Sequence, residues 1–290
     1  RYRDFACWLE AKDPRDLDAQ RAYWKERLKG APAETDLPFD RPQPPAADGR
    51  GAKVRLFLDE KTSARLDALC EARRATPYAF LAAVFGALLS RLSDQRDIVL
   101  GSPVSGRRHP DLMRVTGAFI NTLPLRLSVD ESEPFSAYLS RVQAAAAAML
   151  DHQDLTLDEI VSLADTPREA GRTPLYNVLF SMVPVKPSAF RLGEAELSQL
   201  PLDSGAAKLP LTLEGVRGDK GYAFTLEYAA QLLDEGTAAL WARAFEAAVR
   251  AAVEDAEIPV GGLPAVSPVD RLRLVDRPGR LRALFDDTPA

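Results

Sequence analysis

The sequence predicts an α/β protein, a two-layer sandwich in which helices cover a mixed sheet of five or six strands. Three observations favour this class. Segments with helical periodicity alternate with segments of strand character, no internal repeat is present, and the helix expected from Thr76 to Leu92 is almost wholly apolar. A helix without a polar face must be buried, and a sheet offers a surface that can bury it. Exposure of Leu81, Phe85 or Leu88 would contradict this prediction.

The composition narrows the possible functions. With 290 residues, of which 46% are hydrophobic, the chain has enough apolar material for a core. Its 37 basic and 42 acidic side chains give a net charge of -5 without long runs of one sign, so nucleic acid is not an expected partner. Cys7 and Cys70 belong to no zinc-binding pattern, so no metal site is expected. Apolar stretches fall short of the ~20 residues of a membrane span, so no membrane is expected as a partner and a cytoplasmic location is predicted.

The order of the elements follows from periodicity, caps and breakers. An amphipathic helix at 17–29, ended by Gly30, precedes a proline-rich connector that runs to Gly51. A strand at 53–58 and a helix at 62–74 come next, and the apolar helix has Thr76 as its N-cap and Pro77 as its first residue. The remaining segments are strands at 98–103, 119–129 and 175–185, helices at 134–150 and 157–163, a strand pair at 211–216 and 222–228, a long helix at 235–253, and a polar tail from 263.

One stretch of the chain carries a dense motif. Residues 98–126 read IVLGSPVSGRRHPDLMRVTGAFINTLPLR, which is a strand ending in G-x-P, an arginine loop, and the segment G-x-F-x-N-T-L-P-L-R. This stretch resembles a core motif of the condensation domains of nonribosomal peptide synthetases. Its structural positions are Gly101, Pro103, Gly117, Phe119, Pro124 and Arg126. Pro124 lacks a backbone donor, which indicates an edge strand or a bulge.

Further segments resemble the same family in the same order. They are Y-x-D-F-A-x-W at 2–8, L-P-F-D-R-P at 37–42, H-Q-D at 152–154, R-T-P-L-Y-N-V-L-F at 172–180 with Pro174 as its proline, and a segment at 263–288 similar to the linker into an adenylation domain. The resemblance covers the chain from residue 2 to residue 288. It implies a chloramphenicol-acetyltransferase-like lobe, with a connector between lobes at 1–50, the C-terminal lobe at 51–262 and a linker at 263–290.

The chain also departs from the family pattern. The family's H-H-x-x-x-D-G motif is absent from these 290 residues, whose only histidines are His109 and His152. No catalytic residue is therefore assigned to this chain. Three late positions differ as well. Leu209-Pro210 replaces the usual Phe-Asp, Tyr228-Ala229 replaces Tyr-Asn, and Leu232-Leu233 replaces Leu-Phe.

The resemblance implies roles for a few residues. Arg107 matches the arginine that holds the motif aspartate of the first lobe, so it is the candidate for an interlobe salt bridge. In this chain alone, its replacement is expected to leave the melting temperature almost unchanged. Asn177 and Ser181 lie on the face of the strand at 175–185 opposite to the core, which makes them candidates for the substrate tunnel. Asn121 is a third candidate. For both asparagines, an amide bonded to backbone is the alternative interpretation.

The implied function is amide-bond formation between aminoacyl or peptidyl groups tethered to carrier proteins, with this chain inactive by itself. The implied partners are the first lobe, the upstream and downstream carrier proteins with their 4′-phosphopantetheine arms, and the adjacent adenylation domain, while no cofactor is bound directly. Two alternatives stay open: a stand-alone acyltransferase that uses coenzyme A thioesters, and a non-catalytic module that docks a carrier or a neighbouring protein. A lobe without its partner exposes apolar surface, so self-association of the isolated chain is also expected.

Overall fold

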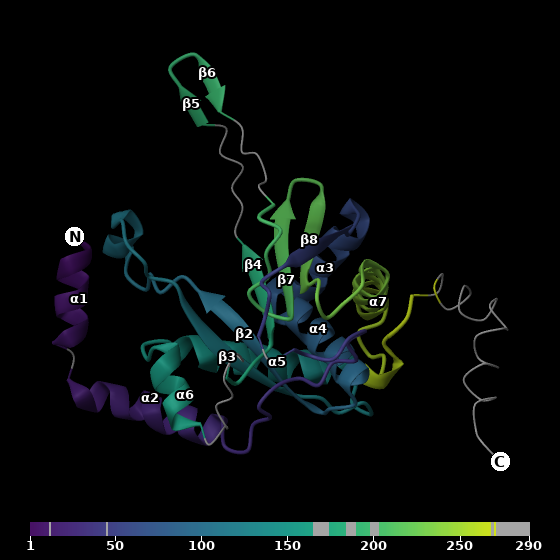
Figure 1. The fold of residues 1–290 in the computed structure, drawn as a ribbon, viewed down its shortest axis with the longest axis horizontal. Coiled ribbons are helices and arrows are strands. Elements are labelled where there is room, and N and C mark those ends of the chain that lie inside the picture. Colours follow the sequence, from purple (N-terminus) through teal and green to yellow (C-terminus); the bar gives the residue numbers. More distant parts are fainter. Residues whose placement is uncertain are drawn as a thin grey trace.

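A six-stranded mixed sheet forms the centre of the protein, and helices cover one of its faces (Figure 1), which confirms the predicted class. The computed structural model describes residues 1–11, 13–44, 46–164, 174–183, 190–197, 203–267 and 270. The helices and strands are, in chain order, α1 (Tyr2–Glu10), α2 (Pro14–Arg27), β1 (Gly51–Phe57), α3 (Glu60–Ala72), α4 (Pro77–Ser93), β2 (Asp97–Val104), η1 (Pro110–Arg114), β3 (Asn121–Ser128), α5 (Phe135–Asp151), α6 (Leu157–Leu163), β4 (Val178–Val183), β5 (Phe190–Leu192), β6 (Ala195–Leu197), β7 (Leu211–Gly218), β8 (Gly221–Ala229), α7 (Glu235–Glu254) and η2 (Val260–Gly262).

The strand order of the sheet is β1-β8-β7-β4-β2-β3, so β1 and β3 are its edges. The pairs β2–β4 and β4–β7 are parallel, and the other neighbours are antiparallel. Pro124 lies in β3, opposite Gly101 of β2. A proline cannot donate a hydrogen bond to a further strand, and the edge position spares it that role.

Helix α4 lies in the middle of the core, as its apolar sequence predicts. The exposed fractions of Leu81, Phe85 and Leu88 are 0%, 2% and 4%. The Thr76 hydroxyl accepts a hydrogen bond from the Ala79 amide at 3.1 Å, which confirms the predicted N-cap. Among the described residues, no single helix is long and apolar enough to cross a membrane, and the bent pair of α3 and α4 meets that test only on combined length and composition.

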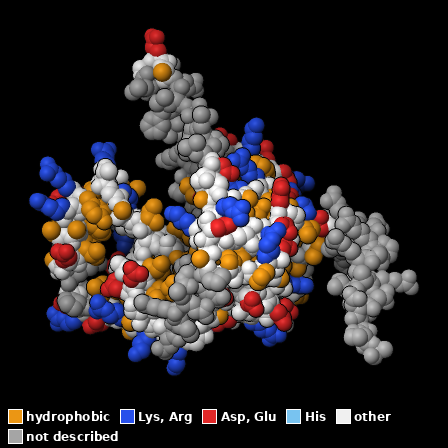
Figure 2. All heavy atoms as spheres, in the orientation of Figure 1, with side chains coloured by type: hydrophobic (Ala, Val, Ile, Leu, Met, Phe, Trp, Pro, Cys, Tyr) orange, Lys and Arg blue, Asp and Glu red, His pale blue; other side chains and the backbone are white. Residues whose placement is uncertain are grey.

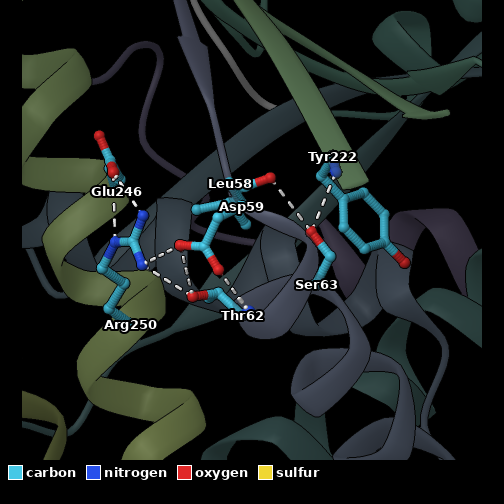
Figure 3. A network of polar contacts seen from close by, with 7 residues as sticks. All are labelled: Leu58, Asp59, Thr62, Ser63, Tyr222, Glu246 and Arg250. Carbon is cyan, nitrogen blue, oxygen red and sulfur yellow. Dashed lines mark hydrogen bonds and ion pairs between the residues drawn. The ribbon is translucent and has the colours of Figure 1, made fainter. Parts of the chain in front are cut away.

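A polar network joins α7 to the start of α3 and to β8 (Figure 3). Asp59 accepts hydrogen bonds from the Thr62 amide at 2.8 Å and from Arg250 at 2.6 Å, so one carboxylate caps α3 and binds α7. The Thr62 amide and the Arg250 guanidinium hold the pKa of Asp59 well below its usual range. Ser63 is buried, and its hydroxyl accepts from the Tyr222 amide at 3.1 Å. These bonds fix the position of the last helix on the sheet.

The N-terminal segment packs on the rest of the protein through α2. Trp24 and Leu28 have exposed fractions of 0% and 1% and belong to the main core. The Trp24 indole donates to the carbonyl of His152 at 2.8 Å. Residues up to 50, which the sequence predicts to be a connector, therefore contribute side chains to the same core as the sheet.

The structure differs from the predicted elements at several ends. The strand expected to start at Leu175 starts at Val178, because Leu175 has a φ of 74° and turns the chain before the ladder begins. The strand expected at 119 starts at Asn121. Helix α1, η1 and the β5–β6 hairpin were not predicted as elements. Arg172, Thr173 and residues 184–185 lie outside the described residues.

Candidate functional site

The loop between β2 and β3, residues 105–120, contains Arg107, Gly117 and Phe119 of the motif. Two hollows, of about 280 and 250 Å³, lie beside this loop, and Arg108 and Gln153 line both of them. The first hollow is also lined by Tyr78, Ser102, Pro103, Val104, Ser105, Arg107, Met149 and Leu150. The second is also lined by Tyr2, Phe5, Trp8, Leu9, Gly106, His109, Leu112, Ala118, Phe119, Ile120, Asn121, Asp154 and Thr156.

Arg107 binds its own loop. Its Nη1 donates to the carbonyls of Leu112 and, at 2.8 Å, of Val115, and its Nη2 lies 3.5 Å from the carbonyl of Gly117. The guanidinium carbon lies 4.1 Å from the ring centroid of Phe119, a cation–π contact. In the part of the chain that the structure describes, no carboxylate pairs with Arg107. The interlobe salt bridge stays a prediction, but the expectation that the isolated chain would be indifferent to loss of this side chain is revised.

Replacing Arg107 with alanine is now expected to lower the free energy of unfolding of this chain by about 1 to 2 kcal/mol, because three loop carbonyls lose a charged donor. Urea denaturation measures the change. Arg107→Lys should restore only part of it, since one ammonium cannot reproduce the planar fork. Arg114→Ala, in the same loop, is the control, because that arginine is exposed. Equal stability of both alanine variants would contradict the loop role.

The neighbouring arginine makes the carboxylate pair. Nη1 of Arg108 lies 2.9 Å from Oδ1 of Asp154, whose Oδ2 accepts from the Gln20 amide at 2.7 Å. The His152 ring stacks on Tyr23 of α2, with centroids 3.8 Å apart and planes 9° apart. The H-Q-D motif therefore connects α2 to the loop. The sequence did not reveal this connection, because Arg108 and Gln20 lie 46 and 134 positions from Asp154.

The two predicted asparagines bond to backbone. Nδ2 of Asn121 donates to the carbonyl of Leu155 at 2.7 Å. Asn177 is 5% exposed, its Oδ1 accepts from the Thr35 amide at 3.0 Å, and its Nδ2 donates to the Thr35 carbonyl at 2.8 Å. Both amides thus hold segments that are distant in sequence, which fits the alternative interpretation of each. Their role in a substrate tunnel stays a prediction.

The alternation of β4 agrees with the sequence. Val178 and Phe180 are fully buried in the core, whereas Leu179 and Ser181 lie on the opposite face and are partly exposed. Ser181 pairs in register with Glu214 of β7. Ser181 therefore lies within β4, on the face opposite to the helices. Of the other two tunnel candidates, Asn121 is the first residue of β3 and Asn177 immediately precedes β4.

Two motif glycines make room for aromatic rings. A Cβ atom at Gly101 would lie 2.4 Å from the Tyr176 ring, and one at Gly117 would lie 2.1 Å from the Tyr2 ring. Contacts below 3.0 Å force something to move, so a larger residue at either position displaces an aromatic side chain. Gly101 lets Tyr176 cross the central strand, and Gly117 lets α1 dock on the loop.

The departures from the family pattern meet at one place. A small cavity of about 60 Å³ is lined by Asn177 together with Leu209, Pro210, Ala229 and Leu232. Two of these segments are also bonded directly to each other, because the Ala229 amide donates to the Pro210 carbonyl at 3.1 Å. The substitutions that the sequence shows at separate positions thus change one region, next to a predicted tunnel residue.

The first hollow contains a hydroxyl pair. The Tyr78 hydroxyl lies 2.6 Å from Oγ of Ser102, and burial raises the pKa of Tyr78 to about 12. The phenol therefore stays neutral near pH 7, where it can donate or accept a hydrogen bond but is a poor base. Sequence reasoning missed this pair, because Tyr78 lies on a core helix 24 positions before Ser102. Neither the charge pattern nor the motif signals it.

The two histidines of the chain have local contacts with the protein. The His109 side chain is 68% exposed, and its Nδ1 accepts from the Asp111 amide at 3.3 Å as a cap of η1. His152 stacks on α2 as described above. No group of three His, Cys, Asp or Glu side chains among the described residues could hold a metal ion.

An apolar face lies over α1 and the loop. It consists of Tyr2, Trp8, Leu9, Met113 and Ile120, which are among the most exposed large hydrophobic residues of the described chain. Figure 2 shows hydrophobic side chains gathered on this side, at the left of the view. Trp8 is 56% exposed and Ile120 is 78% exposed. Contiguous apolar surface of this kind marks interaction sites in soluble proteins.

Comparison with known proteins accounts for the order of the motifs. The chain is 30% identical over 275 residues to surfactin synthase subunit 2 of Bacillus subtilis (strain 168), covering 95% of this chain and 8% of that protein. It is 32% identical over 276 residues to malpinin synthetase of Mortierella alpina, covering 95% and 4%. Malpibaldin synthetase of the same fungus is 34% identical over 263 residues, covering 89% and 5%. The chain thus spans less than a tenth of the length of these relatives.

Solved structures share the fold. A four-domain nonribosomal peptide synthetase bound to AMP and glycine matches with a TM-score of 0.82 at 22% identity, over 90% of this chain and 21% of that one. The X-domain from teicoplanin biosynthesis matches with a TM-score of 0.80 at 28% identity, over 91% of this chain and 62% of that one. The family model for the condensation domain matches residues 1–275. This chain therefore belongs to the condensation domain family of the nonribosomal peptide synthetases.

Proposed function

We propose that this chain is the C-terminal lobe of a condensation domain that forms the amide bond between an aminoacyl or peptidyl donor and an aminoacyl acceptor, each tethered to a carrier protein. The family match over residues 1–275 carries the proposal, together with the motif loop at 105–120. In this proposal, the lobe contributes the two hollows beside the loop at 105–120 and the loop itself, which Arg107 holds in place. The carriers bring the reacting groups on 4′-phosphopantetheine arms, and the assembly works in the cytoplasm.

The chain by itself is proposed to be inactive. Amide formation requires a group that manages the proton of the attacking amine. In the first hollow, the described candidates are a neutral phenol, serine hydroxyls, guanidinium groups and an amide, and none of these accepts a proton readily near neutral pH. The second hollow adds His109, whose Nδ1 accepts from the Asp111 amide, and Asp154, whose carboxylate is paired with Arg108. The H-H-x-x-x-D-G motif of the family is absent from the 290 residues, so we assign the proton step to the first lobe.

The first lobe is proposed to cover the apolar face. The chain covers 62% of the X-domain chain that it matches, so a complete domain of that size has further residues that can pack on this face. Met113 and Ile120 of the apolar face belong to the same loop as Arg107, the predicted interlobe partner, and Tyr2 of α1 bonds to that loop through the Ala118 carbonyl. The carrier proteins and the adenylation domain complete the proposed set of partners.

A direct assay tests the proposal of inactivity. Two carrier proteins loaded with aminoacyl groups are incubated with the 290-residue chain, and the product is measured by mass spectrometry. No amide above the level of a heat-denatured control is expected. Product formed at a rate that depends on the concentration of the chain would show that this lobe holds a base of its own.

Self-association is expected for the isolated chain. Burial of the apolar face between two copies removes apolar area from water, at roughly 25 cal/mol per Å². Light scattering coupled to size exclusion should give a mass that rises with concentration, and Trp8→Glu with Ile120→Glu should return it to that of a monomer. Phe57→Glu is the matched control, because Phe57 is 63% exposed but lies on edge strand β1. A monomer at every concentration, or equal effects of both changes, would contradict the assignment.

A docking module without catalysis is the second candidate. One observation favours it: the X-domain from teicoplanin biosynthesis has been solved in complex with OxyB, and that chain matches this one with a TM-score of 0.82 at 27% identity. A domain with both lobes that binds loaded carriers but forms no amide would favour docking. Amide formation would favour condensation. The acyltransferase that uses coenzyme A thioesters predicts turnover without any carrier.

A further inference from the structure

The chain does not leave the lobe where helix α7 ends. Val260 and Leu263, which follow α7, are 1% and 3% exposed, and the Gly261 amide donates to the Glu131 carbonyl at 2.9 Å. Further on, Ser267 and Asp270 are 7% and 2% exposed. The polar composition of the sequence from residue 263 predicts a tail or an interdomain linker, and Leu263, Ser267 and Asp270 of this segment are buried.

A carboxylate in this segment is bound by an arginine of α7. Nε of Arg243 lies 2.6 Å from Oδ2 of Asp270, and Nη2 lies 3.0 Å from Oδ1, so the contact is bidentate. The Ser267 hydroxyl donates to Oδ2 of Asp270 at 2.6 Å, and the Asp270 amide lies 3.1 Å from the same hydroxyl. Both carboxylate oxygens and the backbone amide of Asp270 therefore have partners.

The local sequence favours this geometry. Residues 267–270 read S-P-V-D, in which a serine precedes an acidic residue by three positions, as in a helix N-terminal capping box. Proline after the serine fits the first position of a helix. The serine thus orients the aspartate, and the planar fork of the arginine matches the two carboxylate oxygens.

Asp270 depends on the pair more than Arg243 does, because the Asp270 side chain is 2% exposed and the Arg243 side chain is 39% exposed. A buried carboxylate requires its partner, because an unpaired charge is costly away from water. The comparable pair of Arg73 and Glu257, with an N···O distance of 2.7 Å, has an acid that is 61% exposed and needs no partner. Loss of Arg243 is relieved when the segment is released and Asp270 reaches water.

We propose that Arg243, Ser267 and Asp270 form a clamp that holds Ser267 and Asp270 on α7. The clamp fixes the position of Asp270 relative to this lobe. If an adenylation domain follows, as the proposed function has it, the clamp also fixes where that domain starts relative to this lobe. The clamp itself depends only on residues of this chain.

Hydrogen–deuterium exchange of the 290-residue chain tests the clamp. In Arg243→Ala and in Asp270→Asn, peptides that cover 263–270 should exchange at least about tenfold faster, while peptides from α7 keep the wild-type rate, because local opening needs no global unfolding. Arg73→Ala is the matched control, since it removes an exposed pair, and it should leave the exchange of 263–270 unchanged. The combined change Arg243→Glu with Asp270→Arg should restore part of the protection.

Two results would overturn the clamp. Unchanged exchange of 263–270 in Arg243→Ala would show that the ion pair does not hold the segment. Equally faster exchange throughout α7 and the sheet would show that the pair stabilises the whole fold and is no local clamp. Inactivity of a complete domain in amide formation would overturn the proposed function without affecting these exchange rates, so the two failures are distinguishable.

Discussion

Replacing Trp24 with alanine is expected to lower the free energy of unfolding by about 3 to 5 kcal/mol, as removal of a fully buried aromatic ring typically does. The side chain is 0% exposed and is the largest fully buried one in the described chain. Its indole also donates to the His152 carbonyl at 2.8 Å, and that partly buried acceptor would lose its partner. The loss should detach α2 from α5 and thereby loosen the loop at 105–120.

Chemical denaturation of matched variants measures this effect. Trp24→Phe keeps most of the packing but not the hydrogen bond, so about 1 to 2 kcal/mol of the loss should remain. Trp8→Ala provides the control, because Trp8 is 56% exposed on α1. If Trp24→Ala is no less stable than Trp8→Ala, α2 does not belong to the core of this lobe.

Arg126→Ala is expected to cost about 2 to 4 kcal/mol, because it removes a charged group with several partners. Nε and Nη2 of Arg126 bind Asp97 at 2.9 and 2.5 Å. The same guanidinium donates to three carbonyls at the end of α2, those of Arg27, Lys29 and Gly30, at 2.9, 2.8 and 3.3 Å. Carbonyls at a helix C-terminus have no partner within the helix, so the motif arginine caps α2 from the edge strand.

The test compares three replacements at the same edge of the sheet. Arg126→Lys should keep only part of the stability, because an ammonium cannot reach an acid and three carbonyls at once. Arg96→Ala, an exposed neighbour, should change the free energy of unfolding by less than about 0.5 kcal/mol. Since Trp24 and Arg126 both fasten α2, their losses should not add in the double variant. Full additivity, or full rescue by lysine, would contradict the capping role.

Elements with a strong pattern of their own could be predicted from the sequence. The nearly continuous apolar surface of α4 indicated a core helix, and Pro124 indicated an edge strand or a bulge, because burial and backbone chemistry are local properties of the residues. The turn at Leu175 could not be predicted. Its positive φ accompanies complete burial of its side chain, whereas the apolar run there is typical of a strand.

The hydrogen-bond and ion-pair partners of the polar site residues were harder to predict from the sequence. The motif drew attention to Arg107, but which of two adjacent arginines reaches a carboxylate depends on the fold, and the structure pairs Arg108 with Asp154. In the same way, Asn177 reaches the backbone of Thr35, which lies 142 positions earlier in the chain. A single sequence carries no signal for contacts of that range. The pairing of Asp270 with Arg243, 27 positions earlier, has no such signal either, although the S-x-x-D spacing at 267–270 is visible in the sequence.

Amide formation by the complete domain tests the central claim most directly. A first lobe that carries the H-H-x-x-x-D-G motif of the family is fused ahead of Arg1, and this extended protein is assayed beside the 290-residue chain, with the same pair of loaded carrier proteins. We predict product from the extended protein only, and loss of product when the second histidine of that motif is replaced with alanine. Product from the 290-residue chain alone, above its denatured control, would contradict the assignment of this chain as the second lobe without the catalytic base.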